Sequence, residues 1–313
     1  MDDQFNLYPS KPRLQQKETK NKWTRTALSF AVFVVSFLIL FSENIQFLAF
    51  LVLVLFIHEL GHFFFMKHFK YKNVRMMFVP LMGAFVQGAK KVYSQKESFL
   101  VVMGGPLPGI LFGVVGAVFA FHFEIDWLLE LSAIFILLNM INLLPLDPLD
   151  GGQLFRLLVK YDHDLFLMVF SLISSLVLIS VGFYIDSWPL MLFGFLMSFR
   201  VRSIQKRYAV RKALSDSDIE YKLDYDALTD QEYARIRSVV LEQNPSLQRY
   251  ENLANKNTDR VIAEHVNTVL EIPLVQDTTL FFKILVVLFW LLSFAAPVYL
   301  FLEFGGRFGW YFI

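Results

Sequence analysis

The feature that most constrains this chain is a series of long apolar runs. A helix needs about 20 apolar residues to cross the roughly 30 Å hydrocarbon core of a bilayer. By that measure the sequence predicts six spans, near residues 27–42, 46–66, 98–121, 127–144, 165–185 and 279–302. A shorter run at 188–200 is either a seventh span or a tilted, half-inserted helix. Because 56% of the 313 residues are hydrophobic, a soluble fold is excluded.

Basic residues at the ends of the spans predict the orientation. Residues 1–26 are polar and basic, and we expect a disordered cytoplasmic tail there. With seven spans, the segments 67–96 and 156–164 and the stretch that opens at Arg200 also lie inside, and all are basic at the membrane boundary. The N-terminus is therefore expected in the cytoplasm and the C-terminus outside. The net charge of +1 gives no bias toward nucleic acid, so none is expected as a partner.

The longest polar stretch covers residues 201–278, and its pattern is helical. Thr229 and Glu232 have the spacing of a capping box, which predicts a helix start. We expect a small helical cytoplasmic domain there, available to a regulatory protein. The predicted fold is thus an all-α polytopic membrane protein of about six to seven transmembrane helices. Its parts are the tail 1–26, a membrane core 27–200, the domain 201–278 and a last helix with its tail, 279–313.

One apolar segment, residues 73–88, is too short to cross and is broken by Pro80 and Gly83. Its Val, Phe and Met residues suit strands. We expect a short β-hairpin or a re-entrant loop. Irregular backbone is tolerated at membrane depth only when it is buried in protein or lines a wet cavity, so this segment is expected to mark a cavity.

A candidate metal-binding motif, His-Glu-Leu-Gly-His, occurs at residues 58–62, inside the second predicted span. Two His residues four apart project from one face of a helix and can clamp a zinc ion. Glu59 follows the first of them, where its carboxylate can take a proton from a metal-bound water. Ionisable groups buried in a lipid-embedded helix are costly unless they bind something, which favours this reading over a purely structural helix.

A catalytic zinc usually takes three protein ligands, so His58 and His62 need a third. The chain has no Cys, which leaves His or carboxylate. The candidates are Asp147 and Asp150, in the Pro- and Gly-rich segment that ends the fourth predicted span. Breaks at Pro and Gly can turn a carboxylate back into the bundle, and the predicted topology places this segment in the same half of the membrane as the His pair.

These residues resemble the site-2 protease family of intramembrane zinc metalloproteases. The resemblance rests on the HELGH motif in a span, the downstream N-x-x-P-x-x-x-x-D-G of residues 142–151, the Gly-Gly-Pro-Leu-Pro-Gly of 104–109 and the Pro80 to Gly83 hairpin. It implies that His58, His62 and Asp150 bind Zn²⁺, that Glu59 is the general base and that Asn142 helps nearby. Asp147 is then a neighbouring group or a helix cap. Resemblance to compact prokaryotic members also favours a bacterial plasma membrane.

The expected activity is hydrolysis of peptide bonds in transmembrane segments of other membrane proteins. Such a segment must unwind before it is cut, and we expect it to pair with the hairpin through Val79, Pro80, Gly83 and Phe85. The bilayer itself is the other expected partner. Family members often have Asn where this chain has Gly109, which puts a polar contact there in doubt. The alternatives are a zinc or other divalent-cation transporter and an inactive, helix-binding relative.

Overall fold

The computed structural model describes residues 8, 10–14, 22–40, 44–79, 83–159, 163–184, 186–251, 256–272 and 274–308. The chain divides into two compact units. We call residues 19–90, 94–158 and 276–313 the core unit, and residues 1–18, 91–93 and 159–275 the helical unit. Each is described by itself.

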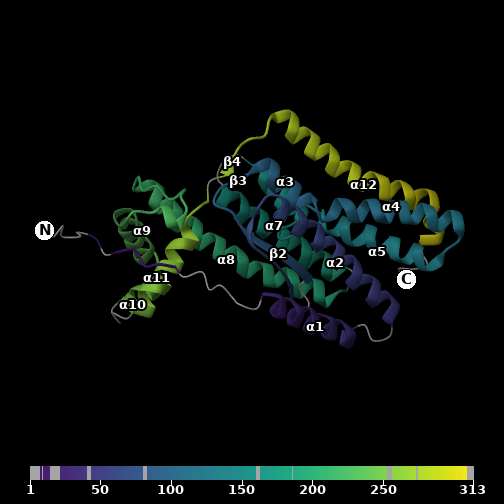
Figure 1. Cartoon of the computed structure of the whole chain (residues 1–313), viewed down its shortest axis with the longest axis horizontal. Helices are drawn as coiled ribbons and strands as arrows, with labels where there is room; N and C mark the ends of the chain where they lie inside the picture. Colours follow the sequence, from purple (N-terminus) through teal and green to yellow (C-terminus); the bar gives the residue numbers. More distant parts are fainter. Residues whose placement is uncertain are drawn as a thin grey trace. The chain divides into compact units, whose positions relative to one another are not determined.

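The core unit holds helices and a hairpin in the order α1 (Lys22–Leu40), α2 (Ile45–His68), β1 (Lys72–Val79), β2 (Gly83–Ala89), α3 (Gln95–Met103), α4 (Pro106–Phe123), α5 (Asp126–Asn142), α6 (Asp150–Leu158) and α12 (Leu280–Phe308). In it, α4 and α5 pack side by side and α12 runs along them (Figure 1). Asn44 caps α2 by accepting the Phe47 N–H, and Pro106 opens α4, where a missing N–H costs nothing.

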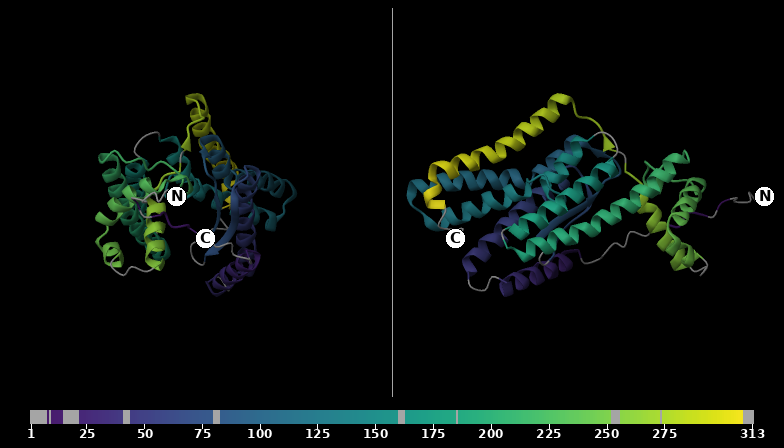
Figure 2. Two further views of the ribbon diagram at one scale, coloured as in Figure 1. Left: turned by 60° about the vertical axis from the view of Figure 1, so that its left-hand side comes forward. Right: turned by 180° about the vertical axis from the view of Figure 1, so that it is seen from behind.

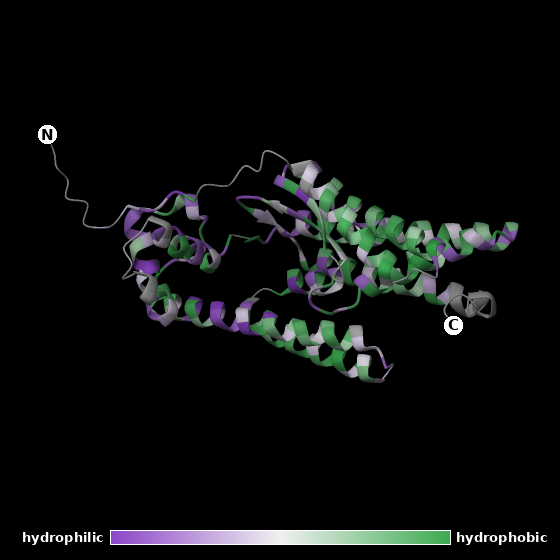
Figure 3. Cartoon of the chain, turned by 90° about the horizontal axis from the view of Figure 1, so that it is seen from below, coloured by the Kyte–Doolittle hydropathy of each residue, from purple (hydrophilic) through white to green (hydrophobic). Residues whose placement is uncertain are grey.

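Four helical stretches of the described residues are long and apolar enough to cross a membrane: Ile45–His68, Gln95–Phe123, Asp164–Tyr184 and Leu280–Tyr299. The expected six to seven spans are therefore not confirmed. The apolar stretch Thr26–Ile39 of α1 is shorter, and α5 has 17 residues, which reach about 26 Å. Many large apolar side chains of the long helices are exposed, as expected for surfaces that face lipid. Hydrophobic residues, coloured green, dominate these helices in Figure 3.

The segment expected to be a hairpin or a re-entrant loop is an antiparallel hairpin. Its register pairs Arg75 with Gln87 and Met77 with Phe85. The outer edge of β1 is covered by α1: the Thr26 hydroxyl donates to Met76 O at 2.9 Å, and the Phe78 N–H donates to Ser29 Oγ at 3.4 Å.

The helical unit contains α7 (His163–Tyr184), α8 (Trp188–Asp216), η1 (Tyr225–Ala227), α9 (Asp230–Glu242), α10 (Pro245–Glu251) and α11 (Lys256–Val269). Two short strands, β3 (Tyr93–Ser94) and β4 (Leu274–Val275), pair with each other. Helices α7 and α8 run side by side (Figure 2). The predicted capping box is confirmed: Thr229 accepts the Glu232 N–H, and Glu232 accepts the Thr229 N–H.

Residues 10–14, in the segment expected to be a disordered tail, lie against the helical unit. The Lys11 ammonium donates to the carbonyls of Tyr225, Asp226 and Leu228, at 2.9, 3.2 and 2.7 Å. Leu14 packs against the apolar core of α9 and α11. The contact of Lys11 could not be predicted from a sequence pattern, because its acceptors are backbone carbonyls that the turn at η1 brings close together.

Candidate metal centre

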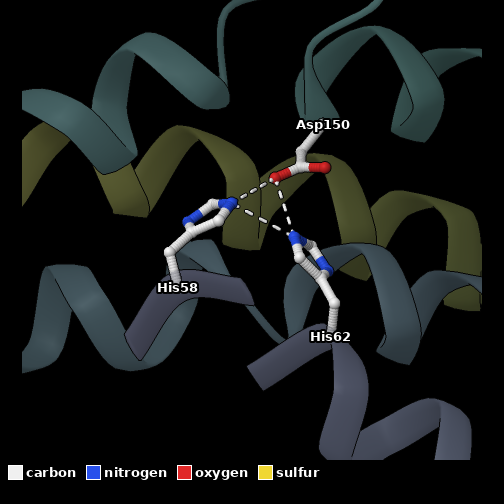
Figure 4. A group of neighbouring side chains, drawn as sticks. All are labelled: His58, His62 and Asp150. Carbon is white, nitrogen blue, oxygen red and sulfur yellow. Dashed lines mark hydrogen bonds and ion pairs between the residues drawn. The ribbon is translucent and has the colours of Figure 1, made fainter. Parts of the chain in front are cut away.

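Three buried side chains from two helices meet in the core unit. His58 and His62 project from α2, and Asp150 is the first residue of α6 (Figure 4). Asp150 Oδ2 lies 3.0 Å from His58 Nε2 and 3.2 Å from His62 Nε2, and the two Nε2 atoms are 3.1 Å apart. Among the described residues this is the one group of three or more acidic or His side chains placed to share a metal ion.

The residues fit a zinc ion. With bonds of about 2.0–2.1 Å, two ligand atoms of a tetrahedral zinc lie about 3.3 Å apart, close to the separations found here. Asp150 Oδ2 is buried and has no hydrogen-bond partner in the structure. A buried carboxylate oxygen without a partner is costly, and a cation held between it and the two imidazoles would remove that cost.

The imidazole of His58 is held by a residue that the sequence analysis did not single out. His58 Nδ1 lies 2.7 Å from Asn139 Oδ1, and Asn139 Nδ2 donates to Phe135 O at 2.7 Å. Because that donation orients the amide, its oxygen faces His58 and must accept the Nδ1 proton. Nε2 is then left with its lone pair toward Asp150 and His62, as metal binding requires.

His62 is oriented in the same way by a backbone carbonyl. Its Nδ1 lies 2.7 Å from the carbonyl oxygen of Val101 in α3, which can only accept, so the proton is on Nδ1. Helix α2 comes this close to the break between α3 and α4 because Gly61 and Gly105 have no side chains. A Cβ on Gly105 would collide with His62 Nε2, and one on Gly61 would collide with the Gly104 carbonyl.

The loop after α5 places Asp150. The chain leaves α5 at Asn142, turns, and starts α6 at Asp150. A Cβ on Gly151 would collide with the carbonyls of Leu143 and Leu144, so the tight return depends on this glycine. Trp290 of α12 donates its indole N–H to Leu143 O at 2.7 Å and holds the loop from the other side.

Glu59 is buried beside the cluster, between the two His residues in the sequence. It is 5% exposed, and its Oε2 has no hydrogen-bond partner in the structure. A carboxylate oxygen that is buried and unpaired within a metal site is free to accept a proton from a bound water.

The other predicted site residues are not part of the three-residue cluster. Asp147 is buried but lies outside the three-residue cluster. Asn142, the last residue of α5, is partly buried, and its helper role stays a prediction. Val79 ends β1, and Gly83 and Phe85 lie on β2. Pro80 lies outside the described residues.

Gly109, where a polar contact was in doubt, lies against the amide of Asn139: a Cβ on Gly109 would collide with it. The polar group at this place therefore comes from α5. The signal for Asn139 was present in the sequence, because a polar side chain inside an apolar span is costly and usually has a partner. The partner itself depends on how α5 is rotated against α2.

A His-Glu-x-x-His pair on a helix apolar enough to cross a membrane, completed by a buried carboxylate, is an arrangement of side chains that zinc metallopeptidases use. Comparison with known proteins agrees with this class. Residues 46–133 match Peptidase family M50. The match includes both His residues and Glu59 but ends before Asp150.

Two curated relatives match over 149 residues, 44% of this chain. Stage IV sporulation protein FB of Bacillus subtilis is 31% identical, with 50% of its length covered. A zinc metalloprotease of Methanocaldococcus jannaschii is 29% identical, with 42% covered. The chain thus spans about half the length of these relatives, or less. A solved site-2 protease from Methanocaldococcus jannaschii aligns with 57% of this chain and 87% of its own, at 22% identity and a TM-score of 0.44.

Residues 46–133 of this chain are thus similar to Peptidase family M50, and one of the curated relatives is a zinc metalloprotease. The resemblance seen in the sequence motifs is confirmed, and with it the protein's place as an integral membrane protein.

Proposed function

We propose that this chain is a zinc-dependent intramembrane endopeptidase that hydrolyses peptide bonds in transmembrane segments of other membrane proteins. The observation that carries the proposal is the ligand triangle of His58, His62 and Asp150, buried in a unit whose α2 is long and apolar enough to span a bilayer. A water-requiring site at that depth suits a substrate that lies in the membrane.

In the proposed reaction the two imidazoles and Asp150 would hold the zinc. A zinc ion at this place would supply the Lewis acidity that activates a water and polarises the substrate carbonyl. Glu59 accepts the proton of the attacking water on its free carboxylate oxygen and later gives it to the leaving amine. Asn139 and the Val101 carbonyl keep both Nδ1 protons in place, so the Nε2 lone pairs stay directed at the metal.

Among the described residues β2 pairs with no strand other than β1, so we propose its second edge as the place where an unwound substrate adds. Met76 O and Phe78 N face α1, where the hydroxyls of Thr26 and Ser29 meet them. Since backbone groups alternate along a strand, Met77 bonds to its partner Phe85 on β2, and Ala84 and Val86 direct their backbone groups away from β1. We therefore expect the substrate to add to β2, with Gly83 and Phe85 on the strand it pairs with and Val79 and Pro80 at the turn.

The protein is proposed to lie in a bacterial plasma membrane with its N-terminus in the cytoplasm. The basic residues that flank the spans support this orientation. The segment 201–278 is proposed as the place where a regulatory protein binds. Nothing favours a cation transporter, because the described residues hold a single metal-type cluster and not a series of ligands along several helices.

The test is cleavage of a panel of single-span helices in liposomes that contain the purified protein. We expect the wild type to cut at least one helix, a zinc chelator to stop it and added zinc to restore it. Glu59→Gln should lose activity by a factor of about 10³ or more, in keeping with loss of the group that moves the proton. Glu130→Gln is the matched control, because Glu130 is on the surface of α5, bonded to Gln46.

Two results would remove the proposal. Cleavage that persists in Glu59→Gln would rule out the proton transfer, and zinc movement across the liposome membrane without any cleavage would promote the transporter.

A further inference from the structure

The core unit contains a cavity that the proposed peptidase chemistry does not use. It is a cavity of about 450 Å³ between α1, α2 and β1, within the range of pockets that hold small ligands. Its lining is mostly apolar and comes from the three elements in turn: Thr26, Ala27 and Phe30; Phe56, Leu60, Phe63 and Lys67; and Asn73, Val74, Arg75, Met76 and Phe78.

The cavity is separate from the metal centre because it uses the other side of α2. Leu60 is two residues from both His58 and His62, and two residues turn an α-helix by about 200°. Phe56, Leu60, Phe63 and Lys67 follow one another at spacings of four, three and four, so they form one stripe on that opposite side. A molecule in this cavity would not touch the zinc ligands.

The charged residues that line the cavity are both cations, Lys67 and Arg75. Lys67 is the last but one residue of α2, and Arg75 stands on β1. No acidic residue occurs between Glu59 and Glu97, while that stretch holds Lys67, Lys70, Lys72, Arg75, Lys90, Lys91 and Lys96. Among the described residues, neither Lys67 nor Arg75 forms an ion pair with a carboxylate. Arg75 donates to the Gln87 amide oxygen at 3.0 Å, and the Lys67 ammonium lies 5.6 Å from the Phe63 ring centre.

The position of the cavity along α2 matches that of a lipid molecule in one leaflet of the bilayer. The apolar lining runs along α2 from Phe63 back toward the N-terminus of the helix at Phe56, and Lys67 lies at the C-terminal end of the span. Lys and Arg at that level attract anionic headgroups, each contributing about 1 kcal/mol near the surface. An acyl chain suits the phenylalanine-lined part, and a phosphate suits the two cations.

We propose that this cavity binds an anionic phospholipid, with one acyl chain between α1 and α2 and the phosphate at Lys67 and Arg75. The charge pattern selects this occupant over a zwitterionic lipid, whose headgroup carries its own cation. The charge pattern also favours an anionic phospholipid over an apolar transmembrane segment, because such a segment would leave both cations without a counter-ion. The proposal stands whether or not the chain cleaves peptides.

The test measures dissociation constants for phosphatidylglycerol and phosphatidylcholine of equal chain length, by native mass spectrometry of the full chain after delipidation in detergent. We expect the wild type to prefer phosphatidylglycerol. In the double variant Lys67→Gln/Arg75→Gln that preference should fall by about 25-fold, or about fivefold for each charge. Both side chains are exposed, so the fold should persist.

The matched control is Lys70→Gln/Lys72→Gln, which removes the same charge from the same basic turn but from residues that do not line the cavity. It should keep most of the preference. A second pair tests the apolar part: Ala27→Trp fills the cavity and should weaken phosphatidylglycerol binding at least tenfold, whereas Leu28→Trp, at a neighbouring exposed position, should not.

Three results would overturn the proposal: equal affinity of the wild type for the two lipids, equal losses in the two double variants, or unchanged binding in Ala27→Trp. A photo-reactive residue at position 27, used in liposomes that contain a single-span helix, distinguishes the occupants. Lipid adducts support the proposal, and adducts only to the helix or to a second copy of the chain contradict it.

Discussion

Replacing Asn139 with Ala should weaken zinc binding without unfolding the protein. Asn139 is fully buried, and its amide links His58 Nδ1 to Phe135 O through two contacts of 2.7 Å. The change leaves the Nδ1 proton of His58 without its acceptor, so the imidazole can turn or change tautomer, and its Nε2 lone pair is no longer held toward the metal.

The expected loss follows from these contacts. Removing the partner that orients a metal-bound His typically costs 10- to 100-fold in metal affinity, or about 1.4–2.7 kcal/mol. Leaving a buried donor unpaired costs about 1–3 kcal/mol, which is the same range. The assay is competition for zinc with a chromophoric chelator in detergent, with the thermal unfolding of the metal-free protein measured in parallel.

Two further variants separate positioning from packing. Asn139→Asp keeps an oxygen for His58, so it should recover most of the zinc affinity although it cannot donate to Phe135. Ser132→Ala removes a buried polar group of the same helix, one that bonds only to Leu128 O among the described residues, and should leave zinc affinity unchanged. A dissociation constant for Asn139→Ala within twofold of the wild type, or an equal loss in Ser132→Ala, would refute the reasoning.

Three other predictions concern the scaffold. Gly105→Ala should abolish stable zinc binding, because its Cβ would displace His62 Nε2; zinc retained at one ion per chain after dialysis would contradict this. Thr229→Ala should destabilise the helical unit by about 1 kcal/mol in denaturant unfolding. Hydrogen bonds from Thr229 lower the pKa of Glu232 from its usual 4.5, so its contribution is complete above pH 4.5 and declines as the pH falls below it. The difference between wild type and Thr229→Ala should therefore shrink in acid, and a constant difference down to pH 3 would be the contrary result. Burial raises the pKa of Asp277, but hydrogen bonds from the Ser94 hydroxyl and the Lys96 N–H outweigh burial and lower that pKa below 3.8. Asp277→Asn should therefore reduce stability at neutral pH and have less effect in acid. Thermal unfolding of the variant and the wild type at the two pH values checks this.

The sequence predicted the chemistry of the metal centre better than its surroundings. The two His residues and Glu59 could be found because the spacing of an α-helix alone sets their relation. Asp150 could be chosen over Asp147 only by resemblance, since the fold of a Pro- and Gly-rich loop decides which carboxylate turns inward. The structure places Asp150 Oδ2 within 3.2 Å of both imidazoles.

What the sequence could not predict depends on packing between elements. The oxygen that orients His58 comes from Asn139 and not from the motif residue Asn142, because the rotation of α5 against α2 decides which amide meets the ring. The hairpin was foreseen as one of two possibilities, but the edge proposed for the substrate was not. The proposed edge is on β2, because two hydroxyls of α1 contact the outer edge of β1 and the described residues give β2 no second strand partner.

The number of spans was the weakest part of the prediction. Hydropathy alone favoured six or seven spans, whereas four helical stretches of the described residues meet the length and composition of a span, so the higher number is not confirmed. The run at 188–200 is the first part of α8, which continues to Asp216 and holds Arg211 in its second half. There Arg211 pairs with Asp164 at 2.7 Å and donates to the carbonyls of Val269 and Leu270.

The measurement that tests the account most directly is X-ray absorption at the zinc edge of the purified protein. We expect one zinc per chain, with two imidazole nitrogens and at least one oxygen about 2.0–2.1 Å from the metal, and loss of the bound zinc in Asp150→Ala. A wild-type protein that takes up no zinc, or a spectrum that is the same in Asp150→Ala as in the wild type, would contradict the proposed centre.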